Sequence, residues 1–256
     1  MTVWALSDPH LSFGTPNKNM DVFGSLWESY TEKIKRHWEE FIKPDDLVLI
    51  PGDISWAMRL EEALIDLMWI DRLPGIKLIL KGNHDFWWSS AAKLNKVLPS
   101  SIHFLQNNAF DWNNLTFGGA RLWDSDEYCF DAFIHFQENP QKKVLRFEEN
   151  GSQRAEQQAA ERNKIFEREL QRLELSLKAM SPTAKMKIAL THYPPIGADL
   201  KPSKASKILE EHHVDICVFG HLHSLKKTES LFGEARGVRY ILTSCDYLDF
   251  KPIRVV

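Results

Sequence analysis

The segment from Ile76 to Asp85 reads Ile-Lys-Leu-Ile-Leu-Lys-Gly-Asn-His-Asp, and it decides the fold. Its first five residues form a short, β-rich run, which is typical of a strand within a sheet. A glycine turn follows at Gly82, and the polar side chains of Asn83 and His84 come directly after it. The segment therefore predicts a buried strand whose carboxyl end carries groups able to bind a metal or a substrate.

The same order of strand and polar turn recurs along the chain. Strand-like runs alternate with helical patterns, and this alternation predicts an α/β layered fold. The predicted strands are Val3–Leu6, Leu47–Ile50, Ile76–Leu80, Leu115–Gly118, Lys187–Leu190, Ile216–Phe219 and Arg239–Leu242, and the predicted helices between them are Val22–Ile42, Leu60–Arg72, Ser89–Val97 and Ser203–His212.

Five of the predicted strands are followed by residue types that bind metals. Because ligands of open α/β sheets bind at the carboxyl ends of the strands, we expect these five turns to converge on one site. Their donors are carboxylate, imidazole and amide groups without sulfur, which suits Mn²⁺, Fe²⁺ or Zn²⁺. Seven donors are too many for one tetrahedral ion. They suit a pair of ions that stabilises the attacking and leaving oxygens of a displacement at phosphorus. The seven are Asp8, His10, Asp53, Asn83, His192, His221 and His223.

Composition limits the classes of partner. The 256 residues carry a formal charge of −3, so a long-range positive field that gathers nucleic acid is not expected. No apolar stretch is long enough for a membrane span, no leader pattern opens the chain, and the three cysteines form no C-x-x-C pair. We therefore expect a single cytoplasmic domain over residues 1–256, with a small phosphorylated molecule as its partner; the oligomeric state stays open.

Residues 127–181 differ in composition, because charged residues and glutamines dominate them. From Ser152, a plausible N-cap, apolar residues recur at helical spacing up to Met180, and Pro182 ends the pattern. This helical insertion is interpreted either as a cap over the active site or, with more weight, as a long amphipathic helix laid on the domain.

Taken together, these motifs resemble those of the calcineurin-like metallophosphoesterase superfamily, in particular a bacterial branch of stand-alone phosphoesterases. The matching elements are Asp8-Pro9-His10, Gly52-Asp53, Gly82-Asn83-His84-Asp85, His192 and Gly220-His221-Leu222-His223. The resemblance implies a four-layer α/β/β/α sandwich of two mixed sheets, with the metal site at the carboxyl ends of the strands.

The resemblance also implies roles for these residues. Asp8, His10 and His223 would bind one metal, Asn83, His192 and His221 the second, and Asp53 would bridge them. A metal-bound hydroxide would attack phosphorus, and His84 would protonate the leaving group as the general acid. Asn83 would also reach a phosphate oxygen.

Two positions depart from the Ser/Thr phosphatase branch of the superfamily. In that branch a second Asp after Gly-Asp orients the catalytic histidine, whereas Trp56 stands here, and Ala57 replaces the basic residue that follows it. Both departures disfavour a protein phosphatase. They leave open which group orients His84.

The substrate stays open between a phosphomonoester and a phosphodiester of a small or medium-sized metabolite. Arg121, just after a strand, is a candidate for gripping a second phosphate. One alternative is a nucleotide-linked pyrophosphate hydrolase similar to the diacyl-UDP-sugar hydrolases of the superfamily, which predicts an apolar groove under residues 127–180. The other is a non-catalytic scaffold of the same fold, which the complete set of site histidines disfavours.

Overall fold

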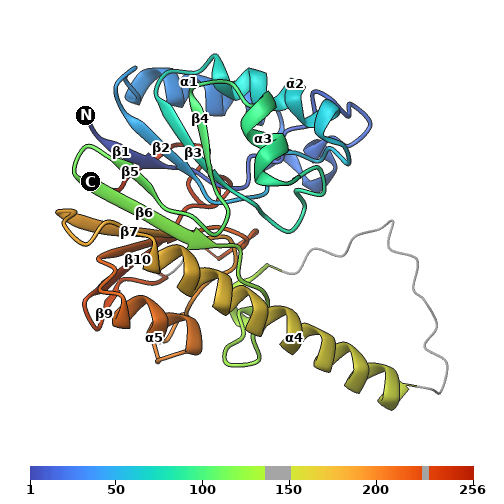
Figure 1. The fold of residues 1–256 in the computed structure, drawn as a ribbon. Helices are drawn as coiled ribbons and strands as arrows, with labels where there is room; N and C mark the ends of the chain where they lie inside the picture. The colour runs from blue at the N-terminus through green and yellow to red at the C-terminus, as the bar shows by residue number, and fades with distance from the viewer. Residues whose placement is uncertain (136–150, 227–230) are drawn as a thin grey trace.

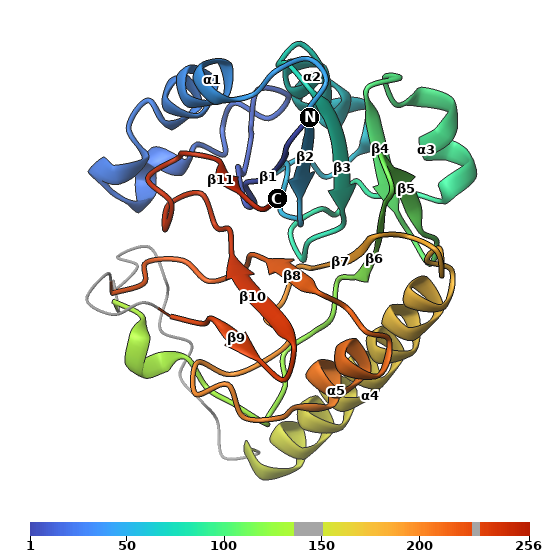
Figure 2. The same cartoon turned by 90° about the vertical axis from the view of Figure 1, so that its left-hand side faces the viewer.

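The protein is described by a computed structural model that covers residues 1–135, 151–226 and 231–256, with the backbone alone for residues 151–158. Two sheets lie face to face, with helices α1, α2 and α3 on one side and α4 and α5 on the other (Figures 1 and 2). This is the four-layer α/β/β/α sandwich expected from the sequence. The helices are α1 (Tyr30–Phe41), α2 (Leu60–Asp71), α3 (Ala91–Val97), α4 (Gly151–Lys178) and α5 (Lys204–Glu211).

Both sheets are mixed: their central strands run parallel, and antiparallel strands occur only at edges. The first has the order β11-β1-β2-β3-β4, in which only β11 runs antiparallel. The second has the order β5-β6-β7-β8-β10-β9, in which β5 and β9 run antiparallel to their neighbours. The strands are β1 (Val3–Ala5), β2 (Leu47–Ile50), β3 (Ile76–Leu80), β4 (Ile102–Leu105), β5 (Phe110–Trp112), β6 (Leu115–Ala120), β7 (Met186–Thr191), β8 (Ile216–Phe219), β9 (Glu234–Ala235), β10 (Val238–Leu242) and β11 (Ile253–Arg254).

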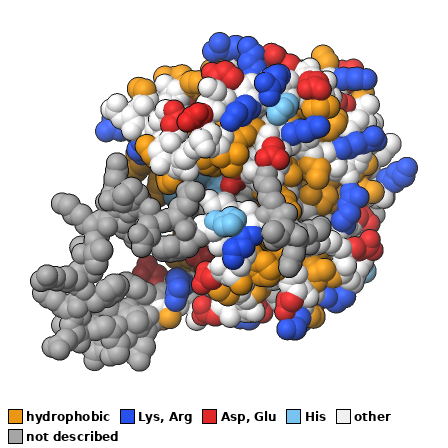
Figure 3. Space-filling model, turned by 180° about the vertical axis from the view of Figure 1, so that it is seen from behind, with side chains coloured by type: hydrophobic (Ala, Val, Ile, Leu, Met, Phe, Trp, Pro, Cys, Tyr) orange, Lys and Arg blue, Asp and Glu red, His pale blue; other side chains and the backbone are white. Residues whose placement is uncertain are grey.

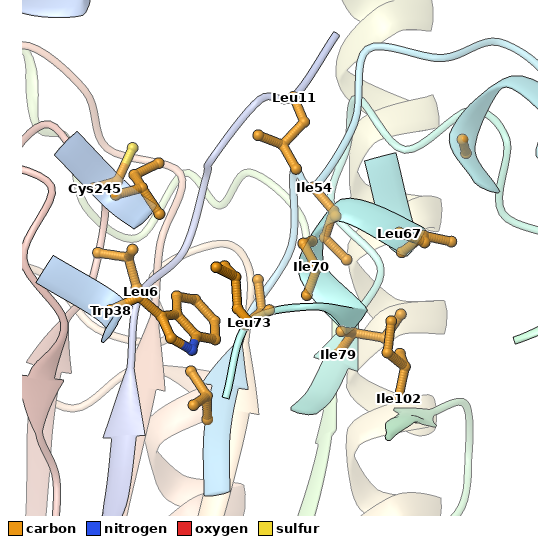
Figure 4. Close-up of a cluster of buried hydrophobic side chains, with 14 of the residues drawn as sticks. Leu6, Leu11, Trp38, Ile54, Leu67, Ile70, Leu73, Ile79, Ile102 and Cys245 are labelled. Atoms are coloured by element: carbon orange, nitrogen blue, oxygen red, sulfur yellow. The ribbon is translucent and has the colours of Figure 1, made fainter. Parts of the chain in front are cut away.

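The continuous apolar strands are buried on both faces because they separate two cores. In β2, Leu47 and Leu49 face the core between the sheets, while Val48 and Ile50 face the core under the helices. Successive side chains of a strand point to opposite faces, so a strand in this position needs apolar residues throughout. Figure 4 shows part of the helix-side core, where Trp38 and Ile70 pack near Ile79.

The predicted helix over Val22–Ile42 is wrong in its first third. Short 3-10 turns at Met20–Phe23 and Ser25–Trp27 precede α1, which begins only at Tyr30. The backbone of Gly24 has a φ of 111° and that of Ser29 a φ of 50°, and neither value fits a continuous right-handed helix. The four short strands β4, β5, β9 and β11 were not predicted, since runs of two to four residues carry little periodic signal.

Helix α4 covers the outer face of the second sheet. Its apolar stripe of Phe166, Leu170, Leu173 and Leu177 is buried there, as is Met180 just beyond its end. Ser176 Oγ accepts a hydrogen bond from the backbone N–H of Gly119 at 2.7 Å. Helix α4 is thus an amphipathic helix of the outer layer, while residues 127–135 of the predicted insertion lie outside it. Residues 136–150, and the side chain of Ala155 in the predicted stripe, lie outside the description.

The surface agrees with the near-balanced charge. On the face seen from behind, acidic and basic side chains are interspersed (Figure 3). Among the described residues, none of the helices is both long and apolar enough to span a bilayer.

Candidate metal centre

All seven predicted donors lie at the carboxyl ends of parallel strands. Asp8 and His10 follow β1, Asp53 follows β2 and Asn83 follows β3; in the facing sheet, His192 follows β7, and His221 and His223 follow β8. Two groups of their ligand atoms lie within 4.8 Å of one another, namely Asp8 with His10 and His223, and Asp8 with Asp53 and His192. The turns of two different sheets therefore meet at one place, as expected.

The first group brings two imidazoles and a carboxylate together. His10 Nε2 lies 3.2 Å from His223 Nε2, and His223 Nε2 lies 3.8 Å from Asp8 Oδ1. Asp8 also accepts hydrogen bonds from Ser7 Oγ at 2.5 Å and from the backbone N–H of His221. These donors fix the carboxylate of Asp8 against the turn after β8.

A further set of contacts joins Asn83 and His221 to His192 of the second group. Asn83 Oδ1 lies 2.6 Å from His192 Nε2 and 3.0 Å from His221 Nδ1. Asp53 Oδ2 lies 3.5 Å from His192 Nε2 and 3.7 Å from His10 Nε2. Asp53 is thus within 4 Å of a nitrogen from each group, which is the position that a shared ligand needs.

Burial and charge make this donor set fit for a cation. Burial, followed by the neighbouring carboxylates, raises the pKa of Asp53, and burial also raises that of Asp8. Burial lowers the pKa of His10 and His192 well below the usual value, which favours the neutral, ligating form. His10 Nδ1 is buried without a hydrogen-bond partner. Buried carboxylates beside neutral imidazoles are stabilised by a bound divalent ion, so the residues present fit the metals.

The backbone around these donors adopts conformations that few residues tolerate. Asp8, His10, Asp53 and His221 have φ values of 58°, 44°, 49° and 71°. Such values cost free energy outside glycine and cluster at functional sites. At Gly220 an added Cβ would collide with the Asp8 carboxylate, so this turn requires glycine.

Asp246 is a part of the site that the sequence analysis missed. It follows β10, the last parallel strand of the second sheet, and Asp246 Oδ1 lies 2.9 Å from His223 Nδ1. Although burial opposes it, nearby carboxylates raise the pKa of His223 to about 9, and Asp246 contributes more than Asp8 or Asp53 does. A carboxylate on the second nitrogen of a ligating imidazole fixes its tautomer and orientation. The sequence did carry one signal for Asp246: like the other donors, it follows a predicted strand.

Trp56, which stands where the Ser/Thr phosphatase branch has an orienting Asp, packs against His84. The ring centroids of Trp56 and His84 are 4.5 Å apart, and Trp56 also stacks on His10 at 4.8 Å. The backbone N–H of His84 donates to Asp53 Oδ1 at 2.8 Å. Ring packing and this loop hydrogen bond, instead of a side-chain carboxylate, restrain His84 in the described structure.

Asp85, which ends the Gly-Asn-His-Asp motif, joins the metal-site loops. Its buried carboxylate accepts hydrogen bonds from the backbone N–H groups of Gly82, Ile54 and Ser55, and from the Trp87 indole. These bonds hold the turns after β2 and β3 together, so Trp87 serves the core.

Arg121 lies beside the metal groups and not among them. Its backbone carbonyl accepts from the N–H of His192 at 3.1 Å, while its guanidinium lies over Trp123 and 3.5 Å from Glu169 Oε1. The structure thus brings Arg121 to the edge of the site, where it faces a separate cavity under α4.

Two cavities are lined in part by site histidines, and another is lined by Arg121. One of about 370 Å³ is lined mainly by apolar side chains, including Trp27 and Trp56, together with His84. A second, of about 550 Å³ under α4, is lined by basic side chains. The third, of about 580 Å³ beside Tyr128, mixes aromatic and acidic residues. Of residues 127–180, Ile134 and His135 line the mainly apolar cavity at His84, whereas α4 presents arginines to the cavity beneath it. The apolar groove expected under this segment therefore stays a prediction.

Comparisons with known proteins bear on the family. Residues 1–225 match the family model described as calcineurin-like phosphoesterase. The sequence finds no match among curated proteins. Among solved structures, a protein of unknown function, AQ665 from Aquifex aeolicus, is similar over 99% of this chain and 95% of its own, with 16% identity and a TM-score of 0.47. The phosphopantetheinyl hydrolase PptH from Mycobacterium tuberculosis is similar over 100% and 95%, with 14% identity and a TM-score of 0.45. Of these findings, the family match alone bears on function.

Proposed function

Since this chain belongs to the calcineurin-like phosphoesterase family, and is accordingly a metal-dependent phosphoric ester hydrolase, we propose that it hydrolyses a phosphomonoester or phosphodiester of a small or medium-sized metabolite. The convergence of seven oxygen and nitrogen donors beside His84 is the observation that carries this proposal. We further propose that it acts as a single cytoplasmic domain.

In this proposal the donors hold two divalent ions. Asp8, His10 and His223 bind one, Asn83, His192 and His221 bind the other, and Asp53 bridges them. The spread of Asp53 contacts toward His10 and His192 supports the bridge. The absence of sulfur from the donor set favours Mn²⁺, Fe²⁺ or Zn²⁺. When bound, such a pair supplies an activated water and positive charge at the non-bridging oxygens of the ester.

The side chains of the chain itself bind and orient the ester. The Asn83 amide can donate a hydrogen bond to a phosphate oxygen while its carbonyl oxygen faces the metal. His84 holds the proton that passes to the leaving oxygen, since its half-buried ring faces the open cavity beside His10. Trp56 keeps this ring in place.

The cavity at His84 bears on the leaving group. Because its walls include Met20, Trp27 and Trp56, they favour a leaving group with an apolar or aromatic part. A nucleotide-linked pyrophosphate hydrolase remains the alternative substrate class, with its base or acyl group in this cavity. A non-catalytic scaffold is the remaining alternative, disfavoured because its metal and acid residues would be superfluous.

Two substitutions test the assigned roles. His84→Asn is expected to lower turnover by about 10²-fold or more while metal content stays at two ions per chain, because a general acid contributes about that factor. Asp53→Asn is expected to lower both metal content and activity, because the carboxylate serves both ions. Metal content is measured by elemental analysis of the purified proteins.

His213→Asn is the matched control. His213 is exposed, and its φ of 55° is one that asparagine readily adopts, so its replacement should leave both readouts unchanged. Loss of both metals from the His84 variant would reject the acid assignment, and full occupancy and activity in the Asp53 variant would reject the bridge.

A further inference from the structure

The cavity under α4 is lined by several basic side chains. It measures about 550 Å³, a size common among small-molecule sites. Lys81 and Arg121 line it from the ends of β3 and β6, and Arg168 and Arg172 line it from α4. Four cations from three elements separated in sequence thus face one space.

One buried carboxylate organises this cluster without neutralising it. Glu169, 1% exposed, is the only acidic residue among those that line the cavity. Its Oε1 lies 2.7 Å from Arg172 Nη1, 3.5 Å from Arg121 Nη2 and 3.7 Å from Arg168 Nε. Four cations and one carboxylate leave a formal charge of +3 at the cavity wall.

Arg121 retains an unsatisfied donor within this wall. Its side chain is 15% exposed, and its Nε is buried without a hydrogen-bond partner. An unpaired buried donor and repelling cations are both relieved by a bound anion.

The cavity shares its strand ends with the metal centre. Lys81 lies two residues before Asn83, and the Arg121 carbonyl accepts from the N–H of His192 at 3.1 Å. Guanidinium groups form paired hydrogen bonds with phosphate oxygens, and three of the four cations are arginines. We propose that this cavity binds a second phosphoryl group of the substrate, distinct from the one hydrolysed. This inference rests on the proposed function, which it narrows to substrates with at least two phosphoryl groups.

Anion binding is tested directly by titrating inorganic phosphate into the full-length protein in a calorimeter, with and without bound Mn²⁺. The test variant is the double substitution Arg168→Gln/Arg172→Gln. Both side chains are about half exposed on α4, which limits the risk to folding. Lys164→Gln, on the exposed face of the same helix and outside the cavities, is the control.

The double variant is expected to bind phosphate at least tenfold more weakly in the metal-free protein, since a hydrogen bond to a charged group contributes about that factor. The control should bind as the wild type does. Phosphate affinity unchanged by the double substitution, in protein with the wild-type melting temperature, would overturn the anion site.

The link to the substrate is tested with fructose 1,6-bisphosphate and fructose 6-phosphate as inhibitors of para-nitrophenyl phosphate hydrolysis. The wild type is expected to bind the bisphosphate at least tenfold more tightly than the monophosphate. The double variant should lose this preference. Equal inhibition of the wild type by both sugars would overturn the second-phosphoryl assignment. If the protein hydrolyses neither substrate nor analogue but its phosphate binding still depends on Arg168 and Arg172, the proposed function is rejected and the anion site is supported.

Discussion

Replacing Asp246 by asparagine should weaken metal binding without unfolding the protein. The two carboxylate oxygens have separate partners: Oδ1 lies 2.9 Å from His223 Nδ1, and Oδ2 accepts from the backbone N–H of Ser224 at 2.9 Å. An asparagine offers one acceptor oxygen, so its NH₂ group must face one of these two N–H donors. Either the imidazole of His223 or the turn at Ser224 then loses its partner.

The expected magnitude follows from the contact with His223. Loss of a carboxylate partner behind a ligating histidine costs about 10- to 100-fold in metal affinity, or about 1.4 to 2.7 kcal/mol. The charge that Asp246 contributes to His223 disappears as well, which reduces the basicity of this ligand.

The assay is competition between the protein and a chelator of known affinity for Mn²⁺. Asp246→Asn should show the weaker affinity, and its activity should recover at saturating Mn²⁺. Asp199→Asn, at an exposed carboxylate that pairs with Lys201, is the control and should behave as the wild type. Equal affinity of the Asp246 variant and the wild type would refute the role assigned to this carboxylate.

Two further predictions concern Trp56 and Lys77. Trp56→Leu should lower kcat by about 10- to 100-fold with little change in metal content, because His84 loses the ring that holds it. Trp56→Phe should retain most of the activity. Equal rates for the two variants would contradict the positioning role. Burial lowers the pKa of Lys77 to about 8 in the folded chain, while the unfolded value is 10.5. Between pH 8 and 10.5 the folded protein binds fewer protons at Lys77 than the unfolded chain does, so this residue should add up to about 3 kcal/mol to the free energy of unfolding as the pH rises. Denaturant unfolding of the wild type and of Lys77→Met at pH 7.5 and 9.5 isolates this contribution, and the wild type should gain about 2 kcal/mol relative to the variant over this interval. An equal change in both proteins would assign it to other groups.

All the strands with a parallel neighbour except β4, and the convergence of the seven candidate donors, could be predicted because each depends on a short local pattern. Continuous apolar runs such as Leu47–Ile50 are long enough to indicate buried strands, and each is followed by a turn of distinctive polar residues. The topology of α/β sheets then brings those turns together. For this reason the sequence could indicate a site before any contact was known.

The features that were missed depend on contacts between distant elements. Asp246 is one carboxylate after one strand, and only its proximity to His223 distinguishes it from a surface residue. Glu169 belongs to a charged helix, where a solvent-exposed position is the ordinary expectation. Its burial follows from Arg121, which reaches it from β6 across the layers of the fold.

The function of Trp56 could not be predicted for a similar reason. An aromatic residue at this position was compatible with core packing, and the sequence showed only that the expected carboxylate was absent. The structure packs its ring against both His10 and His84, so that one side chain contributes to packing and restrains His84.

The most direct test of the account is hydrolysis by metal-stripped protein that is re-supplied separately with Mn²⁺, Fe²⁺, Zn²⁺ and Mg²⁺. Para-nitrophenyl phosphate and bis-para-nitrophenyl phosphate serve as the monoester and diester substrates. We expect no hydrolysis by the stripped protein and its return with at least one of Mn²⁺, Fe²⁺ and Zn²⁺. Hydrolysis that survives metal removal, or folded protein that stays inactive with every ion, would contradict the account.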